Sequence, residues 1–207
     1  MIEKITIYHP KPIKLKDTVM VTDPCYDMKI WCNIKVNDVL PGTYQIFVRR
    51  AKSKKDYYDG VSRLLLVHEN YVHYFKNDKE DLISDINGTN LLKKVKLVHQ
   101  YHQTPIGVDS GLAGFFNYDY FTKIKHSSNE KQTRWYHKVC DKIGNRHYTK
   151  IDTQGFISTN WFGDGGYNLF TFIDKADTTK EITVGFLLDY RLEPIDHISD
   201  NHLELTG

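Results

Sequence analysis

Three aspartates stand beside glycine or proline at positions typical of tight turns, and they are the first candidates for chemistry. They are Asp23 in VTDPCY (residues 21–26), Asp109 in GVDSGLAG (residues 107–114) and Asp164 in GDGGY (residues 163–167). A carboxylate in such a turn can accept hydrogen bonds from nearby backbone amides and so fasten strand ends together. We expect this capping role. The functional alternative is that the three carboxylates converge on one pocket, with Tyr26 and Tyr167 as its walls, and bind a small polar ligand or a cation.

Ser110 is the one serine whose context resembles a nucleophile, because Asp-Ser-Gly also surrounds the reactive serine of trypsin-like proteases. A serine hydrolase further needs a base within hydrogen-bonding reach and an oxyanion hole. The sequence shows neither a suitable histidine context nor a Gly-x-Ser-x-Gly elbow. We therefore expect Ser110 to be part of a glycine-rich turn and keep it as a ligand contact only.

Positive charge is dense only in residues 49–55, which begin with Arg49 and Arg50. A solvated loop is the expected interpretation, and an anion-binding patch is the alternative. No phosphate-binding glycine loop or dinucleotide fingerprint is present. A nucleotide would have to be held by aromatic stacking, for which the chain has fourteen tyrosines and three tryptophans, with Arg49 and Arg50 on its phosphates.

The sequence gives only weak support for a metal site. His99 and His102 are separated by two residues, and they are weak candidate ligands beside the aspartates. No calcium-binding loop or His-Glu-x-x-His pattern occurs. Cys25 and Cys32 do not match zinc-ligand spacing, and Cys140 lies in an expected helix, so we predict structural thiols and no cofactor.

Composition limits the class of protein. The 207 residues carry a formal net charge of +2, with 40% hydrophobic and 26% charged residues. This composition is typical of one globular domain, and nothing in it calls for duplex nucleic acid as a partner. No apolar run approaches the ~20 residues needed to cross a bilayer, so a membrane role is not expected. Three cysteines and no signal-like start favour a cytoplasmic protein, in the host cytoplasm if a phage encodes it.

The elements that must position these residues are mostly strands. Apolar and polar residues alternate in residues 43–50, and further apolar runs are separated by turn residues. Glu69 and Asn70 are expected to be the turn of a hairpin. The only convincing helix covers residues 128–143, with Ser127 and Glu130 at capping-box spacing and Gly144 at its end.

The sequence therefore predicts a β-rich α+β fold with mainly antiparallel sheets, sandwich-like or strongly curved, and one main helix. We expect a single domain over residues 1–207. Its core covers about 19–190, with an N-terminal edge strand at 2–8 and a polar tail at 191–207.

Four motifs in this order resemble an uncharacterised family of bacteria and phages. They are VTDPCY (21–26), GVDSGLAG (107–114), WYHKVC (135–140) and GDGGY (163–167). The resemblance spans about residues 19–190 and implies one fold without implying an activity. The chain departs from the family pattern at Thr22, where serine is usual, and in the longer acidic turn 174–180.

These observations favour a non-enzymatic binding protein of phage or low-GC bacterial origin. We expect it to capture a small polar ligand, such as a nucleotide signal, or a host protein, and to act against a host defence. One alternative is a metal-assisted hydrolase that uses the aspartates with His99 or His102. Another is a structural virion or interaction component that forms a homo-oligomer.

Overall fold

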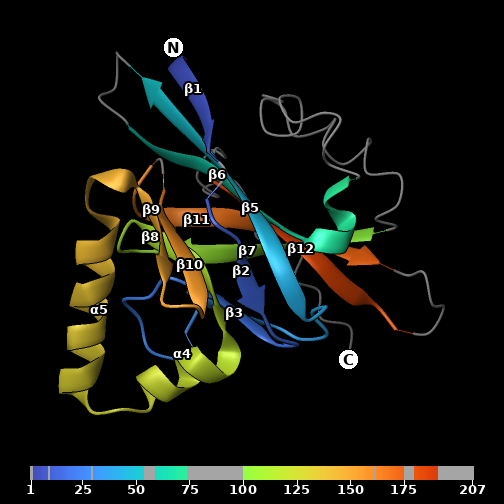
Figure 1. Ribbon diagram of the computed structural model, residues 1–207. Coiled ribbons are helices and arrows are strands. Elements are labelled where there is room, and N and C mark those ends of the chain that lie inside the picture. Colours follow the sequence, from blue (N-terminus) through green and yellow to red (C-terminus); the bar gives the residue numbers. More distant parts are fainter. Residues whose placement is uncertain are drawn as a thin grey trace, which may run out of the picture.

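In the part of the chain that the computed structural model describes, two antiparallel sheets are accompanied by two α-helices, which confirms the predicted fold class (Figure 1). The structure describes residues 2–8, 10–28, 30–53, 59–73, 100–160, 162–174 and 180–190.

The larger sheet has seven strands in the order β1-β5-β6-β12-β11-β7, and the short strand β2 also pairs with β5. Its strands are β1 (Ile2–Tyr8), β2 (Ile13–Leu15), β5 (Gly42–Ser53), β6 (Asp59–His68), β7 (Gln100–Val108), β11 (Gly165–Asp174) and β12 (Ile182–Asp189). Strand β1 lies at one edge, as predicted for residues 2–8. The last strand of the chain, β12, lies in the middle of the sheet, between β6 and β11.

The smaller sheet has five strands in the order β4-β3-β8-β10-β9. Its strands are β3 (Val19–Thr22), β4 (Asn33–Val36), β8 (Leu112–Asn117), β9 (Tyr148–Ile151) and β10 (Gly155–Thr159). Gly114 lies at its centre, paired with Thr22 on one side and Ile157 on the other. A Cβ atom on Gly114 would lie 2.3 Å from the carbonyl oxygen of Phe156. Glycine is therefore needed here for the strands to approach each other.

The main hydrophobic core lies between the two sheets. Both contribute fully buried side chains, such as Phe186 and Leu66 from the larger sheet and Phe115 and Phe156 from the smaller one. Rings of Phe115 and Phe186 meet at 5.3 Å between centroids. Residues alternate along each strand because successive side chains point to opposite faces.

Helices α4 (Tyr118–Lys125) and α5 (Asn129–Ile143) cover the other face of the smaller sheet (Figure 1). Trp135, Val139 and Ile143 recur at i, i+4 and i+8, and all three are buried against that face. The predicted apolar stripe of α5 and its end at Gly144 are thus confirmed. The capping box is wrong, because the helix begins at Asn129 after Ser128, and the Ser127 hydroxyl donates to the Ile124 carbonyl at 2.5 Å.

Two other expectations also need correction. Helix α4 was not predicted, because the run of aromatic and β-branched residues in YDYFTKIK is typical of strands. The hairpin expected at Glu69 and Asn70 is wrong: residues Glu69–Tyr71 form a 3₁₀ helix, η1, and β6 pairs instead with β5 and β12.

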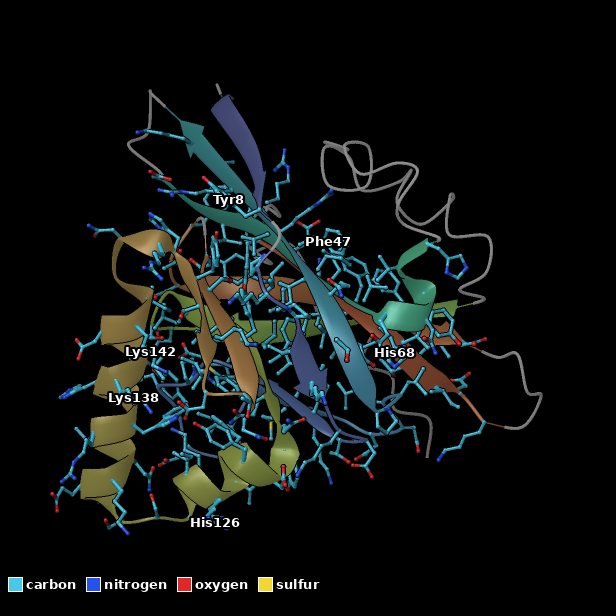
Figure 2. The ribbon with its side chains drawn as sticks, viewed as in Figure 1. Tyr8, Phe47, His68, His126, Lys138 and Lys142 are labelled. Atoms are coloured by element: carbon cyan, nitrogen blue, oxygen red, sulfur yellow. The ribbon has the colours of Figure 1, made fainter. Side chains whose placement is uncertain are left out.

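Figure 2 shows the side chains on the helices and those on the larger sheet away from the helices. Lys138 and Lys142 project from α5 toward Asp152, whose carboxylate lies 3.1 and 3.3 Å from their amino groups. Phe47 and His68 belong to the larger sheet, and Phe47 packs on the face opposite the main core.

Candidate functional site

The chain passes from one sheet to the other twice at the same place, and this place holds two of the candidate motifs. Residues 109–111 connect β7 of the larger sheet to β8 of the smaller one, and residues 160–164 connect β10 to β11. We call these two connections the inter-sheet corner. Val108 pairs with Gly165 on one side of the corner and Leu112 pairs with Thr159 on the other. The Asn160 amide also donates to the Gly111 carbonyl at 3.0 Å, so the two connections run side by side.

Asp23 fastens the end of β3 to this corner. Its carboxylate is fully buried and accepts four hydrogen bonds. The amides of Asp109 and Ser110 donate to Oδ2 at 2.8 and 2.7 Å, while the Ser110 hydroxyl and the Cys25 amide donate to Oδ1 at 2.7 and 2.9 Å. These four donors occupy both carboxylate oxygens, so Asp23 has the geometry of the expected cap.

The second connection is held by Asn160, which the sequence analysis did not single out. Its side chain accepts from the Gly163 amide at 2.6 Å and donates to the Gly163 carbonyl at 2.5 Å. Gly163 has φ of 84°, a left-handed conformation that favours glycine. The Tyr167 hydroxyl also donates to the Gly163 carbonyl at 2.8 Å, and its ring is buried beside Tyr190. Tyr167 therefore belongs to the core, and burial raises its pKa to about 12.

Helix α5 brings the third motif to the corner through Tyr136. Burial raises the pKa of its hydroxyl, and the side chains of Ser110 and Cys140 are close enough to affect that pKa as well. Ser110 therefore lies between Asp23 and Tyr136. All four motifs that suggested a family resemblance thus meet at one end of the molecule, which sequence spacing alone could not show.

The turn after β3 closes as its proline predicted, with the Tyr26 amide donating to the Asp23 carbonyl at 3.4 Å. Tyr26 is half-buried there. Lys125 of α4 donates from Nζ to the Pro24 carbonyl at 3.0 Å, and burial lowers its pKa. All three cysteines are free thiols. Burial raises the pKa of Cys32 to about 11, with smaller effects from Asp23 and Cys25, so this thiol is unreactive at neutral pH.

Trp31 is the most exposed large apolar side chain among the described residues, and the sequence analysis missed it. The residue is 65% exposed, although its ring rests on β7 at Gly107. A Cβ atom on Gly107 would lie 1.8 Å from two ring carbons of Trp31, so only glycine permits this contact. Ile106 and Val108 point into the main core, and Gly107 between them faces the opposite side. The indole thus has one face against backbone and leaves the rest to solvent.

Asp109 and Asp164 are exposed at the same end of the β7–β11 ladder. The last register pair is Val108 with Gly165, and each aspartate stands one residue beyond it on its own strand. Gly107, which carries Trp31, lies two residues before Asp109. The three predicted aspartates are therefore gathered at the corner in different roles. Asp23 is buried as a cap, while Asp109 and Asp164 face solvent, each two residues along its strand from the Gly107–Gly166 pair where Trp31 rests.

Arg49 and Arg50 lie elsewhere. Both belong to β5, four strand spacings from β7, which amounts to about 19 Å. Arg50 forms a two-pronged ion pair with Asp59 at 2.7 Å for both contacts. Arg49 is buried and donates to Ser62 at 2.8 Å. The structure does not bring either arginine to the aspartates.

The structure places no metal site around these residues within the described ranges, where no group of three or more histidine, cysteine or acidic side chains could hold an ion. His99 lies outside the described residues. His102 is described only by its backbone, which pairs with Thr171.

Two shallow clefts of about 390 and 280 Å³ lie away from the corner. The first is lined by Asp38, Pro41 and Lys180 among others, and the second lies between β4 and the residues Leu169, Thr171 and Ile173. Neither is lined by a predicted site residue.

Comparison with protein-family models finds none that matches the chain, and comparisons with curated proteins and with solved structures find no significant match. The family resemblance of the four motifs therefore stays a prediction. Among the described helices, none is long and apolar enough to cross a bilayer.

Proposed function

We propose that this protein is a non-enzymatic binding protein that captures a polar ligand or a partner protein at the outer side of the inter-sheet corner. The observation that carries the proposal is the Trp31 indole, held against Gly107 in a residue that is 65% exposed. Keeping a large apolar ring in water is unfavourable, and exposed aromatic side chains are enriched where proteins bind. Asp109 and Asp164 add polar groups beside it.

The hydrogen bonds of the corner support binding more than catalysis. Ser110 donates its hydroxyl proton to Asp23, and the same carboxylate accepts three backbone amides. That arrangement fixes a turn, whereas a nucleophile needs a base that is available to take its proton. Most of the 28 basic residues are lysines, which is a bias of AT-rich coding. This bias and the four motifs extend the proposal to a phage or low-GC bacterial protein that acts against a host defence.

Intrinsic fluorescence tests the proposal, because Trp31 is one of only three tryptophans and its emission depends on what covers the ring. Purified protein is titrated with mononucleotides, cyclic dinucleotides, free amino acids, and basic, neutral and acidic peptides. We expect at least one of these classes to change the emission of the wild type, and the change to be smaller in W31F, which keeps Trp161 in the sequence of the second connection. Trp135, which is buried between α5 and the smaller sheet, supplies the matched control W135F, which should keep the response of the wild type.

Chromatography of the same mixtures separates binding from catalysis. The bound compound is expected to be recovered unchanged after prolonged incubation. Conversion to a product at a rate that D109N or D164N abolishes would show instead that the aspartates are catalytic, and the proposal would be wrong.

A further inference from the structure

We infer that the corner binds a basic side chain, arginine or lysine, presented by a partner protein. This inference rests on the proposed function and names the class of ligand. It comes from the charges beside Trp31, from the exposure of the ring and from the glycine that holds it.

The charges beside the ring favour a cation. Asp109 and Asp164 are both exposed. Each is the first residue beyond the last β7–β11 pair, Asp109 on the β7 side and Asp164 on the β11 side. A guanidinium or ammonium group can lie over an indole face while carboxylates accept its N–H groups. A phosphate at the same place would be repelled by both aspartates. The arginines that were candidates for phosphate binding lie about four strand spacings away.

The exposure of the ring favours a protein over a small molecule. Small-molecule sites are concave and enclose most of their ligand, whereas Trp31 is 65% exposed to solvent. Phe162 adds a second large apolar side chain that is 49% exposed on the same corner. A partner surface can cover both rings, and tryptophan and arginine are the residues that most often dominate such interfaces.

Gly107 prepares the ring for binding. The indole rests directly on the β7 backbone, and any side chain at position 107 would displace it. This contact restricts the ring on one side, so less side-chain freedom is lost when a partner binds. The sequence feature behind the surface is the glycine, because the tryptophan itself follows the VTDPCY motif without belonging to any motif or periodic pattern.

Selection from a displayed library of random linear peptides on the immobilised full-length chain tests the inference. The peptides retained by the wild type are sequenced and compared with those retained by the variant D109N/D164N, in which both side chains keep their size but lose their charge. We expect arginine or lysine to be enriched at one peptide position in the wild-type pool and not in the variant pool. For a synthetic peptide from that pool, each aspartate substitution should weaken binding about three- to fivefold, as for exposed ion pairs. Replacing its basic residue by citrulline or norleucine should weaken binding at least as much.

Salt supplies a second readout, because exposed charge pairs are screened at higher ionic strength. Binding of the basic peptide should weaken as sodium chloride rises from 50 to about 500 mM, and the dependence should shrink in D109N/D164N. The outcomes separate the two proposals. A nucleotide or an acidic peptide that quenches Trp31 and tolerates D109N/D164N overturns the basic-partner inference and leaves the binding function standing. A library from which nothing is retained in a Trp31-dependent way overturns the basic-partner inference. The binding function is overturned as well if none of the nucleotides, amino acids and peptides of the fluorescence titration gives a Trp31-dependent change.

Discussion

Asp23 shows how one buried carboxylate can define a corner of the fold. It reaches from the end of β3 to two amides that lie 86 and 87 residues further along the chain, and it also orients Ser110. A charged acceptor with four short donors replaces the water that would otherwise solvate both the carboxylate and the amides. Its role is thus to hold the surface on which Asp109 is displayed.

Replacing Asp23 with asparagine should destabilise the fold. The amide of D23N presents two N–H donors where the native carboxylate only accepts, so at least one backbone amide loses its partner. We expect unfolding in urea to show a loss of about 2–3 kcal/mol. D109N is the matched control, because the Asp109 side chain is exposed, and its effect should stay within about 0.5 kcal/mol. Equal effects of the two substitutions would contradict the capping role.

Arg49 and Arg63 are buried on neighbouring strands and differ in how well their charges are paired. Arg63 donates to Asp189 at 3.1 Å, and both side chains are buried. Arg49 is paired with Arg63 across the strands, and its Nε has no hydrogen-bond partner among the described residues. Burial lowers the pKa of Arg49 to about 10, with a further contribution from Arg63 that Asp189 partly offsets.

Methionine substitutions of the two arginines should change the free energy of unfolding by different amounts. R63M removes the hydrogen-bonded ion pair with the buried Asp189 and should cost about 3–5 kcal/mol of unfolding free energy. R49M removes the less well paired charge, and we expect a change of less than about 1 kcal/mol, with stabilisation as the favoured direction. Thermal and urea unfolding of both variants provide the measurement. A loss for R49M as large as that for R63M would show that both charges are needed.

At the scale of elements, the smaller sheet depends on a glycine at its centre. Gly114 on β8 lies between β3 and β10, and the atom nearest to an added Cβ is the backbone oxygen of Phe156. Backbone cannot move aside as the tip of a flexible side chain can. The position of the glycine therefore sets how closely three strands pack over the helices.

G114A should be the most damaging glycine substitution in this region. We expect it to cost more than about 3 kcal/mol, since the neighbouring strand must shift. Gly111 is the control: no atom lies within 4 Å of its added Cβ, but its φ is 68°. G111A should therefore cost only about 1–2 kcal/mol of backbone strain. Circular dichroism and urea unfolding check both values. If G111A were the more damaging of the two, packing around β8 would not be the limiting factor.

Sequence patterns predicted the elements with clear periodicity and missed those that depend on distant contacts. The alternation in β5 and the apolar stripe of α5 were readable because each repeats within one segment. Helix α4 was hidden by its aromatic residues, of which Phe121 is buried and Tyr118 and Tyr120 are partly buried in the cluster between the smaller sheet and α5. Strand order was out of reach, because β12 pairs with β6 more than a hundred residues earlier.

The candidate site was predictable in part for the same reason. Glycine and proline beside each aspartate marked Asp23, Asp109 and Asp164 as turn residues, and the structure gathers them at one corner. Their different burial could not be predicted, since it depends on which sheet end covers which turn. Trp31 gave no periodic or motif signal. The only available clue was Gly107, an isolated glycine in a strand pattern, which can mark close approach by another group.

At the scale of the whole molecule, the shared core makes the two sheets depend on each other. Leu66 and Phe115 come from different sheets and belong to one cluster of buried side chains. Each lies on an inner strand, paired on both sides. Losing either sheet would expose the apolar face of the other, so we expect both to unfold as one cooperative unit.

Native-state hydrogen exchange tests this dependence. The amides of Leu66 and Phe115 should exchange with the same free energy, equal to that of global unfolding. Amides of the edge strand β4 should exchange with a lower free energy, because one side of this strand has no partner strand in the smaller sheet. A clearly lower value for Phe115 than for Leu66 would mean that the smaller sheet and its helices open separately.

The central position of β12 also bears on how the chain is made in a cell. During synthesis β6, β7 and β11 all emerge before Ile182–Asp189, yet β12 is the strand that joins β6 to β11. Until it leaves the ribosome, both neighbours have an open edge of unpaired amides and carbonyls, and such edges recruit other chains. Nascent chains of this protein should therefore depend on chaperones until the end of translation, and a premature stop before Ile182 should yield aggregates instead of a smaller folded domain.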